Sequence, residues 1–295
     1  MYERHFGFKS RPFSLTPDPA FLFPSPQHAM AMTMLEYSLE SQAPFTLLTG
    51  DIGSGKTTLV RRLLRQLGDQ VTVGLISNTH AQFKSIHSWA LSALGIAAAD
   101  NSEIALYEAL VDSFVREYRE GKRTLLIFDE AQNLSIERLE ELRLLSNVNS
   151  ESDTVLQILL VGQPELRDKL SRPELQQFAQ RISVDFHLTP LGRAETHAYI
   201  RHRLQVAEGD PDLFQPAAIE SMFSQTHGVP RLLNRLADFA LVYAFADQRA
   251  TIDEGLIADV LRDRSGREGT SDSPPPISPP PGCVDQRRRR VKSSP

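Results

Sequence analysis

Five short apolar runs are spaced along the first two thirds of the chain, each bounded by residues typical of turns. They occupy residues 45–49, 71–76, 124–128, 156–161 and 182–188. Longer stretches with helical apolar spacing lie between them, so strands alternate with helices. This alternation predicts an α/β fold of three layers, in which helices cover both faces of a parallel five-stranded sheet.

Beyond residue 190 the strand pattern stops and only helical periodicity continues. Helices are predicted over 193–206, 216–226, 230–246 and 253–262, and two of them begin at a proline, Pro216 and Pro230. Proline is favoured at the first helical position because its missing N–H would be unpaired there anyway. We therefore expect a second, smaller, all-helical domain over residues 192–265.

Composition limits the class of protein. The 295 residues are 41% hydrophobic, enough for one large domain or two modest ones, and the single cysteine, Cys283, rules out a disulfide framework or a multi-cysteine metal site. The longest apolar stretch, 239–246, is far shorter than the roughly 20 residues that cross a bilayer. The N-terminus lacks the apolar core of a signal peptide. These features predict a cytoplasmic protein without a transmembrane segment.

Charge differs between the body of the chain and its end. From Gly266 onward there are six basic and three acidic residues, a net charge of +3. The net charge of the whole chain is −5, so that of residues 1–265 is −8. Seven of the nineteen prolines also lie beyond residue 273, which predicts a disordered, Pro-rich basic tail over 266–295. The run 287–290 can contact nucleic acid or anionic lipid, or it is simply a solvated end. The acidic body argues weakly against a broad nucleic-acid-binding face.

The segment GDIGSGKTT, residues 50–58, follows the first predicted strand and opens a helix predicted over 57–67. It satisfies the phosphate-loop pattern G-x-x-x-x-G-K-[ST], in which backbone N–H groups and a helix N-terminus surround phosphate oxygens. Lys56 is predicted to reach the β- and γ-phosphates, and the Thr57 hydroxyl to ligate Mg²⁺. The residues predicted to hold ATP are Gly50, Asp51, Gly53, Ser54, Gly55, Lys56, Thr57, Thr58 and Asp129.

Two adjacent carboxylates follow the third predicted strand, in TLLIFDEAQ. Asp129 is predicted to hold the Mg²⁺ ion, and Glu130 to polarise the attacking water as a general base. A protein that only binds nucleotide has no need of the second carboxylate. The pair therefore favours an ATP hydrolase, with Glu130 and Lys56 among its catalytic residues.

Three further residues are candidates for catalysis. Gln163 ends the fourth strand and either positions the water or merely opens the next helix ahead of Pro164. Arg181 precedes the fifth strand and either enters the site of a neighbouring subunit or complements the dipole of its own helix. Arg231 opens a helix of the small domain, an unfavourable place for a cation, so we expect its charge to face the γ-phosphate across the domain cleft.

Several motifs occur together in one order: FGF…RPFSLTPDPAFLF…H, GDIGSGKTT, LIFDEAQNL, VGQPEL, QRI…LTPL and HGVPRLLN. From about Tyr2 to Arg262 the chain resembles the AAA+ ATPases of the general secretion pathway protein A family, which includes pilus-biogenesis and exosortase-associated ATPases. The resemblance implies a lead-in over 1–30 that packs near the adenine, a P-loop AAA+ domain over 31–191 and a helical lid over 192–265. Asp18, Pro19 and His28 match positions of the lead-in without a role that the residues themselves explain.

The resemblance also implies partners. A ring or filament of copies of the chain, formed with nucleotide, and secretion or pilus membrane proteins are expected, with a peripheral location at the inner membrane. We therefore favour an ATPase that assembles or remodels a secretion or pilus complex. The alternative is a DNA-directed AAA+ ATPase, either a transposition helper or an initiator-like loader, although the residues after Arg264 are too few for the winged helix that loaders usually carry. Nucleic acid is the less favoured partner.

Overall fold

A computed structural model describes residues 1–16, 18–77, 85–149 and 154–268. The chain divides into a unit of residues 1–260 and a second unit that begins at Leu261. Most of the predicted tail, with Cys283 and the basic run 287–290, lies outside the described residues. Within the described ranges no helix is long and apolar enough to cross a membrane.

The five predicted strands form one parallel sheet in the order β2-β3-β4-β1-β5. Every predicted strand is present within one residue of its expected ends. Their bounds are Phe45–Gly50 (β1), Val71–Ile76 (β2), Arg123–Phe128 (β3), Leu156–Gly162 (β4) and Ile182–Leu188 (β5). The order places β4 between β1 and β3, so the loops that follow these three strands are neighbours at one edge of the sheet.

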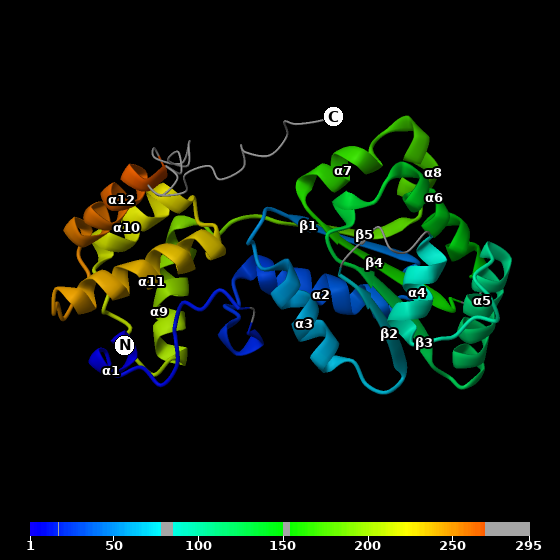
Figure 1. Ribbon diagram of the computed structural model, residues 1–295, viewed down its shortest axis with the longest axis horizontal. Helices are drawn as coiled ribbons and strands as arrows, with labels where there is room; N and C mark the ends of the chain where they lie inside the picture. Colours follow the sequence, from blue (N-terminus) through cyan, green and yellow to red (C-terminus); the bar gives the residue numbers. More distant parts are fainter. Residues whose placement is uncertain (17, 78–84, 150–153, 269–295) are drawn as a thin grey trace, which may run out of the picture. The chain divides into compact units, whose positions relative to one another are not determined.

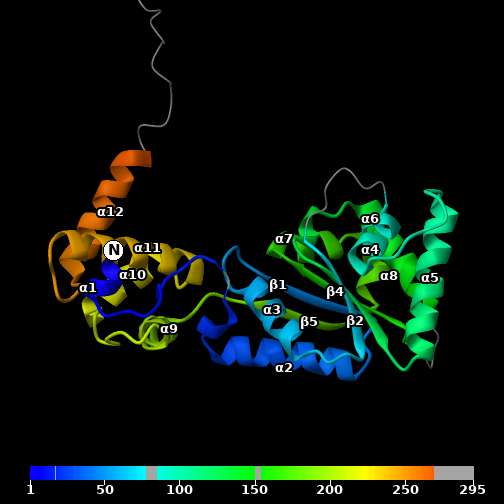
Figure 2. The same cartoon turned by 60° about the horizontal axis from the view of Figure 1, so that its bottom comes forward.

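Helices cover both faces of this sheet (Figures 1 and 2), and a separate core lies on each face. Successive side chains of a strand point to opposite faces, and Leu126 and Phe128 accordingly join one core while Leu125 and Ile127 join the other. The second core is closed by α2 (Pro26–Glu40) and α3 (Lys56–Gln66). The first is closed by α4 (Ile86–Leu94), α5 (Glu103–Arg119), α6 (Ile136–Leu145), α7 (Pro164–Leu170) and α8 (Gln176–Ala179). The predicted three-layer sandwich is thus confirmed.

The helical region after β5 consists of α9 (Arg193–Val206), α10 (Pro216–Thr226), α11 (Pro230–Ala246) and α12 (Glu254–Glu268). Pro216 and Pro230 both stand at the start of their helices, as the sequence predicts. The last helix continues past the expected Arg262 to Glu268. Leu191 N–H donates to Gly228 O at 3.0 Å, which ties the start of α11 to the segment that leaves β5.

The residues before α2 form a short helix, α1 (Tyr2–His5), and a 3₁₀ turn, Pro19–Phe21, capped by the Asp18 side chain. The first part of this lead-in lies on the helical region: Tyr2 OH donates to Asp238, and Lys9 N–H donates to Ala207 O at 3.0 Å. Residues from Ser14 onward instead line a pocket together with the loop after β1. The lead-in therefore links the helical region to the sheet domain.

Candidate active site

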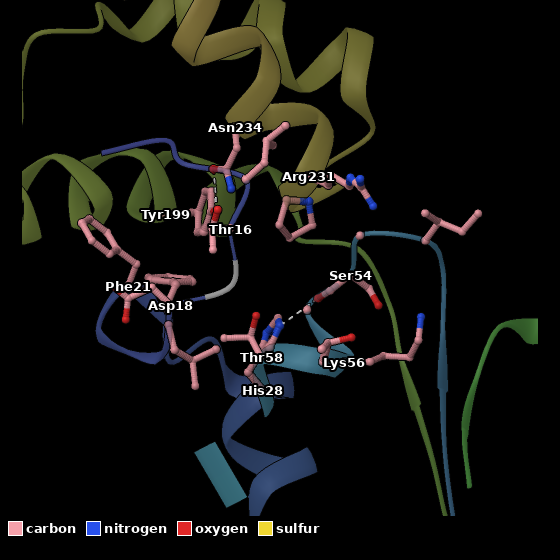
Figure 3. A pocket seen from close by; sticks show the side chains of 18 of the residues that line it. Thr16, Asp18, Phe21, His28, Ser54, Lys56, Thr58, Tyr199, Arg231 and Asn234 are labelled. Atoms are coloured by element: carbon pink, nitrogen blue, oxygen red, sulfur yellow. Dashed lines mark hydrogen bonds between the residues drawn. The ribbon is translucent and has the colours of Figure 1, made fainter. Parts of the chain in front are cut away.

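A pocket of about 370 Å³ opens at the loop between β1 and α3 (Figure 3). It has two walls of different origin. One wall, which we call the phosphate wall, comprises residues 52–58 with Glu130 and Gln163. The other, the lead-in wall, comprises lead-in residues, Leu191 before α9, and residues of α9 and α11. Its members are Ser14, Leu15, Thr16, Asp18, Phe21, Leu22, Phe23, His28, Leu191, Tyr199, Arg203, Pro230, Arg231 and Asn234.

The loop of the phosphate wall has little room for side chains. Gly53 and Gly55 have φ angles of 81° and 108°, a region that L side chains rarely adopt. A Cβ atom at Gly53 would lie 2.3 Å from Arg231 Cβ, and one at Gly55 would lie 2.8 Å from His28 Nε2. Gly53 and Gly55 are thus both required by backbone conformation and by close neighbours. Because these two residues have no side chains, their backbone lines the pocket directly.

Lys56 is buried at the start of α3 and folds back over the loop. Its Nζ donates to Gly50 O at 2.6 Å and to Asp51 O at 2.9 Å. Burial lowers the pKa of this amine, while the carboxylates of Glu130 and Asp129 act in the opposite direction. Gly50 and Asp51 do not line the pocket. Their carbonyl oxygens instead bind the Lys56 ammonium, which does.

Thr57 and Asp129 come together where α3 begins and β3 ends. Thr57 Oγ1 donates to Asp129 Oδ2 at 3.4 Å, and the N–H of Glu130 donates to Asp129 Oδ1 at 3.0 Å. Burial raises the pKa of the Asp129 carboxyl, and the Glu130 N–H opposes that shift. The two predicted metal ligands are therefore adjacent, and both are partly buried; Thr57 lines the pocket, whereas Asp129 does not.

Glu130 is held at the pocket by two amide side chains. Its Oε2 accepts from Gln163 Nε2 at 3.3 Å and from Gln132 Nε2 at 2.6 Å. Gln163 also precedes Pro164 as the N-cap residue of α7, so its backbone opens a helix while its side chain reaches the carboxylate. The two interpretations offered by the sequence are compatible. Gln132 was not among the predicted residues, although the motif LIFDEAQNL contains it.

His28 joins α2 to the phosphate loop. Its Nε2 donates to Ser54 O at 3.0 Å, and its Nδ1 lies 2.7 Å from Ser25 Oγ. Because a carbonyl only accepts, Nε2 carries the proton, and Nδ1 of the neutral ring accepts from the serine hydroxyl. Burial lowers the pKa of His28, which favours this neutral form. The structure thus supplies a contact for the histidine that the sequence left without a role.

Arg203 organises the lead-in wall and was also missed by the sequence reasoning. This buried side chain of α9 donates through Nε to Pro12 O at 2.5 Å and through Nη2 to Ser14 O at 3.3 Å. Its guanidinium carbon stands 4.6 Å from the centre of the Phe21 ring. Nearby, Tyr199 OH donates to Asn234 Oδ1 at 2.7 Å. Nothing in the local sequence around residue 203 indicates a partner about 190 residues earlier.

Arg231 lies in the pocket, and Arg181 does not. The N–H of Arg231 donates to Gly53 O at 3.2 Å, which sets its side chain beside the loop (Figure 3). Among the described residues its guanidinium has no hydrogen bond or ion pair. Arg181 Nη1 instead donates to Arg143 O at 3.1 Å and to Ser146 Oγ at 2.6 Å, at the end of α6. Arg181 therefore contacts the C-terminal end of α6 and not the end of α8, the helix that precedes Arg181 in the chain.

Comparisons with known proteins agree with this geometry. An AAA domain matches residues 39–170. The chain is 37% identical over 273 residues to General secretion pathway protein A of Aeromonas hydrophila, which covers 92% of this chain and 50% of that protein. It is also 31% identical over 88 residues to a putative ORC1-type DNA replication protein 1 of Thermoplasma acidophilum, covering 30% of this chain and 25% of that protein.

The fold is found in solved structures as well. The ORC2 protein of Aeropyrum pernix, described as ADPNP-ADP complexes, superposes with a TM-score of 0.65 at 21% identity, covering 87% of this chain and 72% of that one. A five-stranded parallel sheet, a helical region and a phosphate loop beside an acidic strand end together define a P-loop ATP hydrolase of the AAA+ class. Within that class, the chain is similar to General secretion pathway protein A over 92% of its own length. It spans about half the length of the General secretion pathway protein A that it matches.

Proposed function

We propose that this chain binds ATP with Mg²⁺, hydrolyses it, and uses the cycle to assemble or remodel a bacterial secretion or pilus complex at the inner membrane. The observation that carries the process is the 37% identity to General secretion pathway protein A across 92% of the chain. The pocket supplies the chemistry. Its phosphate wall and its lead-in wall accommodate the two ends of a nucleotide.

Lys56 is the proposed phosphate ligand of the loop. Its ammonium donates to two carbonyl oxygens, which are neutral acceptors. A phosphate carries full negative charge, so it attracts the ammonium more strongly than a neutral carbonyl does. A nucleotide in the pocket is therefore expected to draw Nζ away from the loop carbonyls and toward its terminal phosphates.

Thr57 and Asp129 fit a magnesium ion. Mg²⁺ prefers oxygen ligands, and it commonly uses one or two protein groups together with substrate phosphates. The Thr57 hydroxyl at the start of α3 and the Asp129 carboxylate after β3, 3.4 Å apart, are oxygens of that kind. When bound, the ion would neutralise negative charge on the phosphates.

Glu130 is the proposed general base. Its carboxylate is exposed to the pocket, where an attacking water can reach it, and general-base catalysis of this kind contributes typically 10²–10⁴-fold. Gln163, hydrogen-bonded to the same carboxylate, is the proposed water-positioning residue. Arg231 is the proposed ligand of the γ-phosphate within the chain, because its guanidinium lies at the pocket without another described partner.

Arg181 is proposed to act between copies of the chain. It lies outside the pocket of its own chain, so a catalytic role requires the site of a neighbour. We accordingly propose a ring or filament that forms with nucleotide. The contact of Arg181 with the end of α6 is the competing, purely structural role.

Complementation tests the proposed process. In cells lacking this chain, the wild type should restore export of a secreted substrate or display of the pilus, whereas Glu130→Gln should not restore either. Export and display that never depend on the chain would overturn the proposed process. The expected membrane location is tested in the same cells, by fractionation with and without the stalled variant.

A second candidate, a DNA-directed ATPase, rests on the 31% identity over 88 residues to the ORC1-type DNA replication protein. Its test is the ATPase rate with added duplex DNA over a range of salt concentrations. Phosphate contacts lose affinity steeply with salt, so stimulation that falls with salt would favour this candidate. A rate indifferent to DNA at low salt would exclude it.

A further inference from the structure

We propose that Gln132 is a positioning residue of the hydrolysis reaction: it anchors one oxygen of the Glu130 carboxylate and leaves the other to accept a proton from water. The inference rests on the proposed general-base role of Glu130. It adds a residue that touches neither nucleotide nor water and acts through the base.

The orientation of the Gln132 amide is fixed by a group that can only donate. The backbone N–H of Gln163 donates to Gln132 Oε1 at 3.1 Å. The NH₂ end must therefore face away from Gln163 N–H, and it lies 2.6 Å from Glu130 Oε2. Gln132 thereby connects the carboxylate after β3 to the first residue before α7.

Both side-chain donors converge on the same carboxylate oxygen. Gln132 Nε2 and Gln163 Nε2 donate to Glu130 Oε2, whereas Oε1 has no hydrogen bond to the described residues. A carboxylate held by one oxygen has a defined rotation, so its free oxygen points in one direction. In the proposed reaction, this free oxygen is the one that accepts a proton from the attacking water.

The backbone that carries Gln132 is itself fastened. Lys169 Nζ, on α7, donates to Gln132 O and to Leu134 O, both at 2.6 Å. Glu130 adopts a left-handed conformation with φ of 56° as the residue that precedes the 3₁₀ turn Ala131–Asn133. A non-glycine residue held in this region carries strain that the surroundings must support. Here the surroundings are the fastened turn and its amide contacts.

The space for Gln132 depends on a neighbouring glycine. A Cβ atom at Gly162, the last residue of β4, would lie 3.0 Å from Gln132 Oε1 and 3.3 Å from Gln132 N. Glycine at the end of β4 therefore leaves room for the amide, and a larger residue at position 162 would displace it.

Two substitutions separate the donor function from the acceptor function. Gln132→Met keeps the approximate shape and removes both hydrogen bonds. Gln132→Glu keeps an acceptor for Gln163 N–H but replaces the donor to Glu130 with a carboxylate. If anchoring of Glu130 matters, both variants should lower kcat about 10- to 100-fold, with the Kd for ATP and the melting temperature close to those of the wild type. Gln177→Met, an exposed residue of α8, is the matched control and should leave kcat unchanged.

A double variant ties the effect to the base. In a Glu130→Gln background, Gln132→Met should have no further effect on the residual rate, because the group through which it acts is already disabled. Near-wild-type kcat in Gln132→Glu, or equal fractional losses with and without Glu130, would overturn the proposal. A wild-type chain that hydrolyses no ATP would instead refute the proposed function itself, so the two failures are distinguishable.

Discussion

The two walls of the pocket are built in different ways. The phosphate wall comes largely from one contiguous strand, loop and helix, and its key contacts, such as Lys56 to Gly50 O, join residues that are close in sequence. The lead-in wall joins residues that are far apart, such as Arg203 and Pro12. A local wall is specified by backbone conformation and is recognisable as a motif, whereas a wall made by tertiary contacts leaves no local signature.

The proposed role of Arg181 most strongly challenges the view that the phosphate wall is built locally. If the Arg181 of a neighbouring copy enters the pocket, the phosphate wall of one chain is incomplete by itself. An arginine that enters a neighbour's site contributes about 10³–10⁵ in rate. Arg181→Ala should then bind ATP and hydrolyse almost none, and mixing it with inactive Lys56→Ala should restore part of the activity. Steady-state ATPase assays of the single and mixed proteins measure this.

A structural control is available for Arg181. Ser146→Ala removes one of its two acceptors and leaves the guanidinium in place, so its ATPase rate should stay close to wild type. If Arg181→Ala and Ser146→Ala both hydrolyse ATP normally and only melt earlier, Arg181 serves the end of α6 alone.

Within the phosphate wall, binding and hydrolysis should separate. Lys56→Ala should lose measurable ATP binding, because the ammonium that meets the phosphates is gone. Glu130→Gln should bind ATP and turn it over about 10²–10⁴-fold more slowly. Calorimetric titration and ATPase assays distinguish the two, with Glu137→Gln on the exposed first turn of α6 as control. Equal loss of ATP binding in both variants would contradict the assigned roles.

The lead-in wall should respond in stability as well as in binding. Arg203→Met leaves the carbonyls of Pro12 and Ser14 without their donor, at a cost of about 1–3 kcal/mol in the free energy of unfolding. ATP affinity should fall with it, because lead-in residues line the pocket. Thermal melts and nucleotide titrations test both.

Arg201→Met is the matched control for that experiment, since Arg201 lies on the same helix and pairs with Asp212 at the surface. Such pairs contribute little, typically less than about 1 kcal/mol. Melting temperatures that fall equally in both variants would show that the contacts of Arg203 with the lead-in contribute no more to stability than a surface ion pair does.

The smallest expected effect concerns His28, where the two walls meet. Because burial lowers its pKa in the folded state, the unfolded chain binds more protons below about pH 6.5, and stability falls as the pH falls through that range. His28→Gln retains a donor for Ser54 O but does not titrate. Its stability should fall less steeply between pH 7 and pH 5.5, by at most about 1.4 kcal/mol per pH unit. Parallel slopes for the two proteins would exclude a contribution from His28.

The contrast between the walls also accounts for what the sequence predicts. The five strands and the starts of α9, α10 and α11 follow from apolar periodicity and from prolines at helix starts. Asp129 and Glu130 are recognisable because they are two adjacent carboxylates at the end of an apolar strand in a chain that also carries a phosphate loop. The family resemblance placed the lead-in near the nucleotide as a whole, but not its individual contacts.

Gln132 and Arg203 escaped prediction for a physical reason. The Gln132 amide has meaning only once the sheet order brings the start of α7 beside the end of β3. Arg203 lies on a helix rich in basic residues, so in the sequence alone it resembles an ordinary solvated arginine. In both cases the informative partner belongs to another element, and sequence spacing does not reveal it.

The contact between Gly53 and Arg231 links the shape of the phosphate loop to the start of α11. With Arg231 Cβ only 2.3 Å from where a Gly53 Cβ would stand, and with the Arg231 N–H on Gly53 O, neither partner can shift far alone. Even the smallest enlargement, Gly53→Ala, would have to push the first turn of α11 outward. The phosphate loop and the first turn of α11 therefore pack so closely that there is no room for one additional methyl group between them.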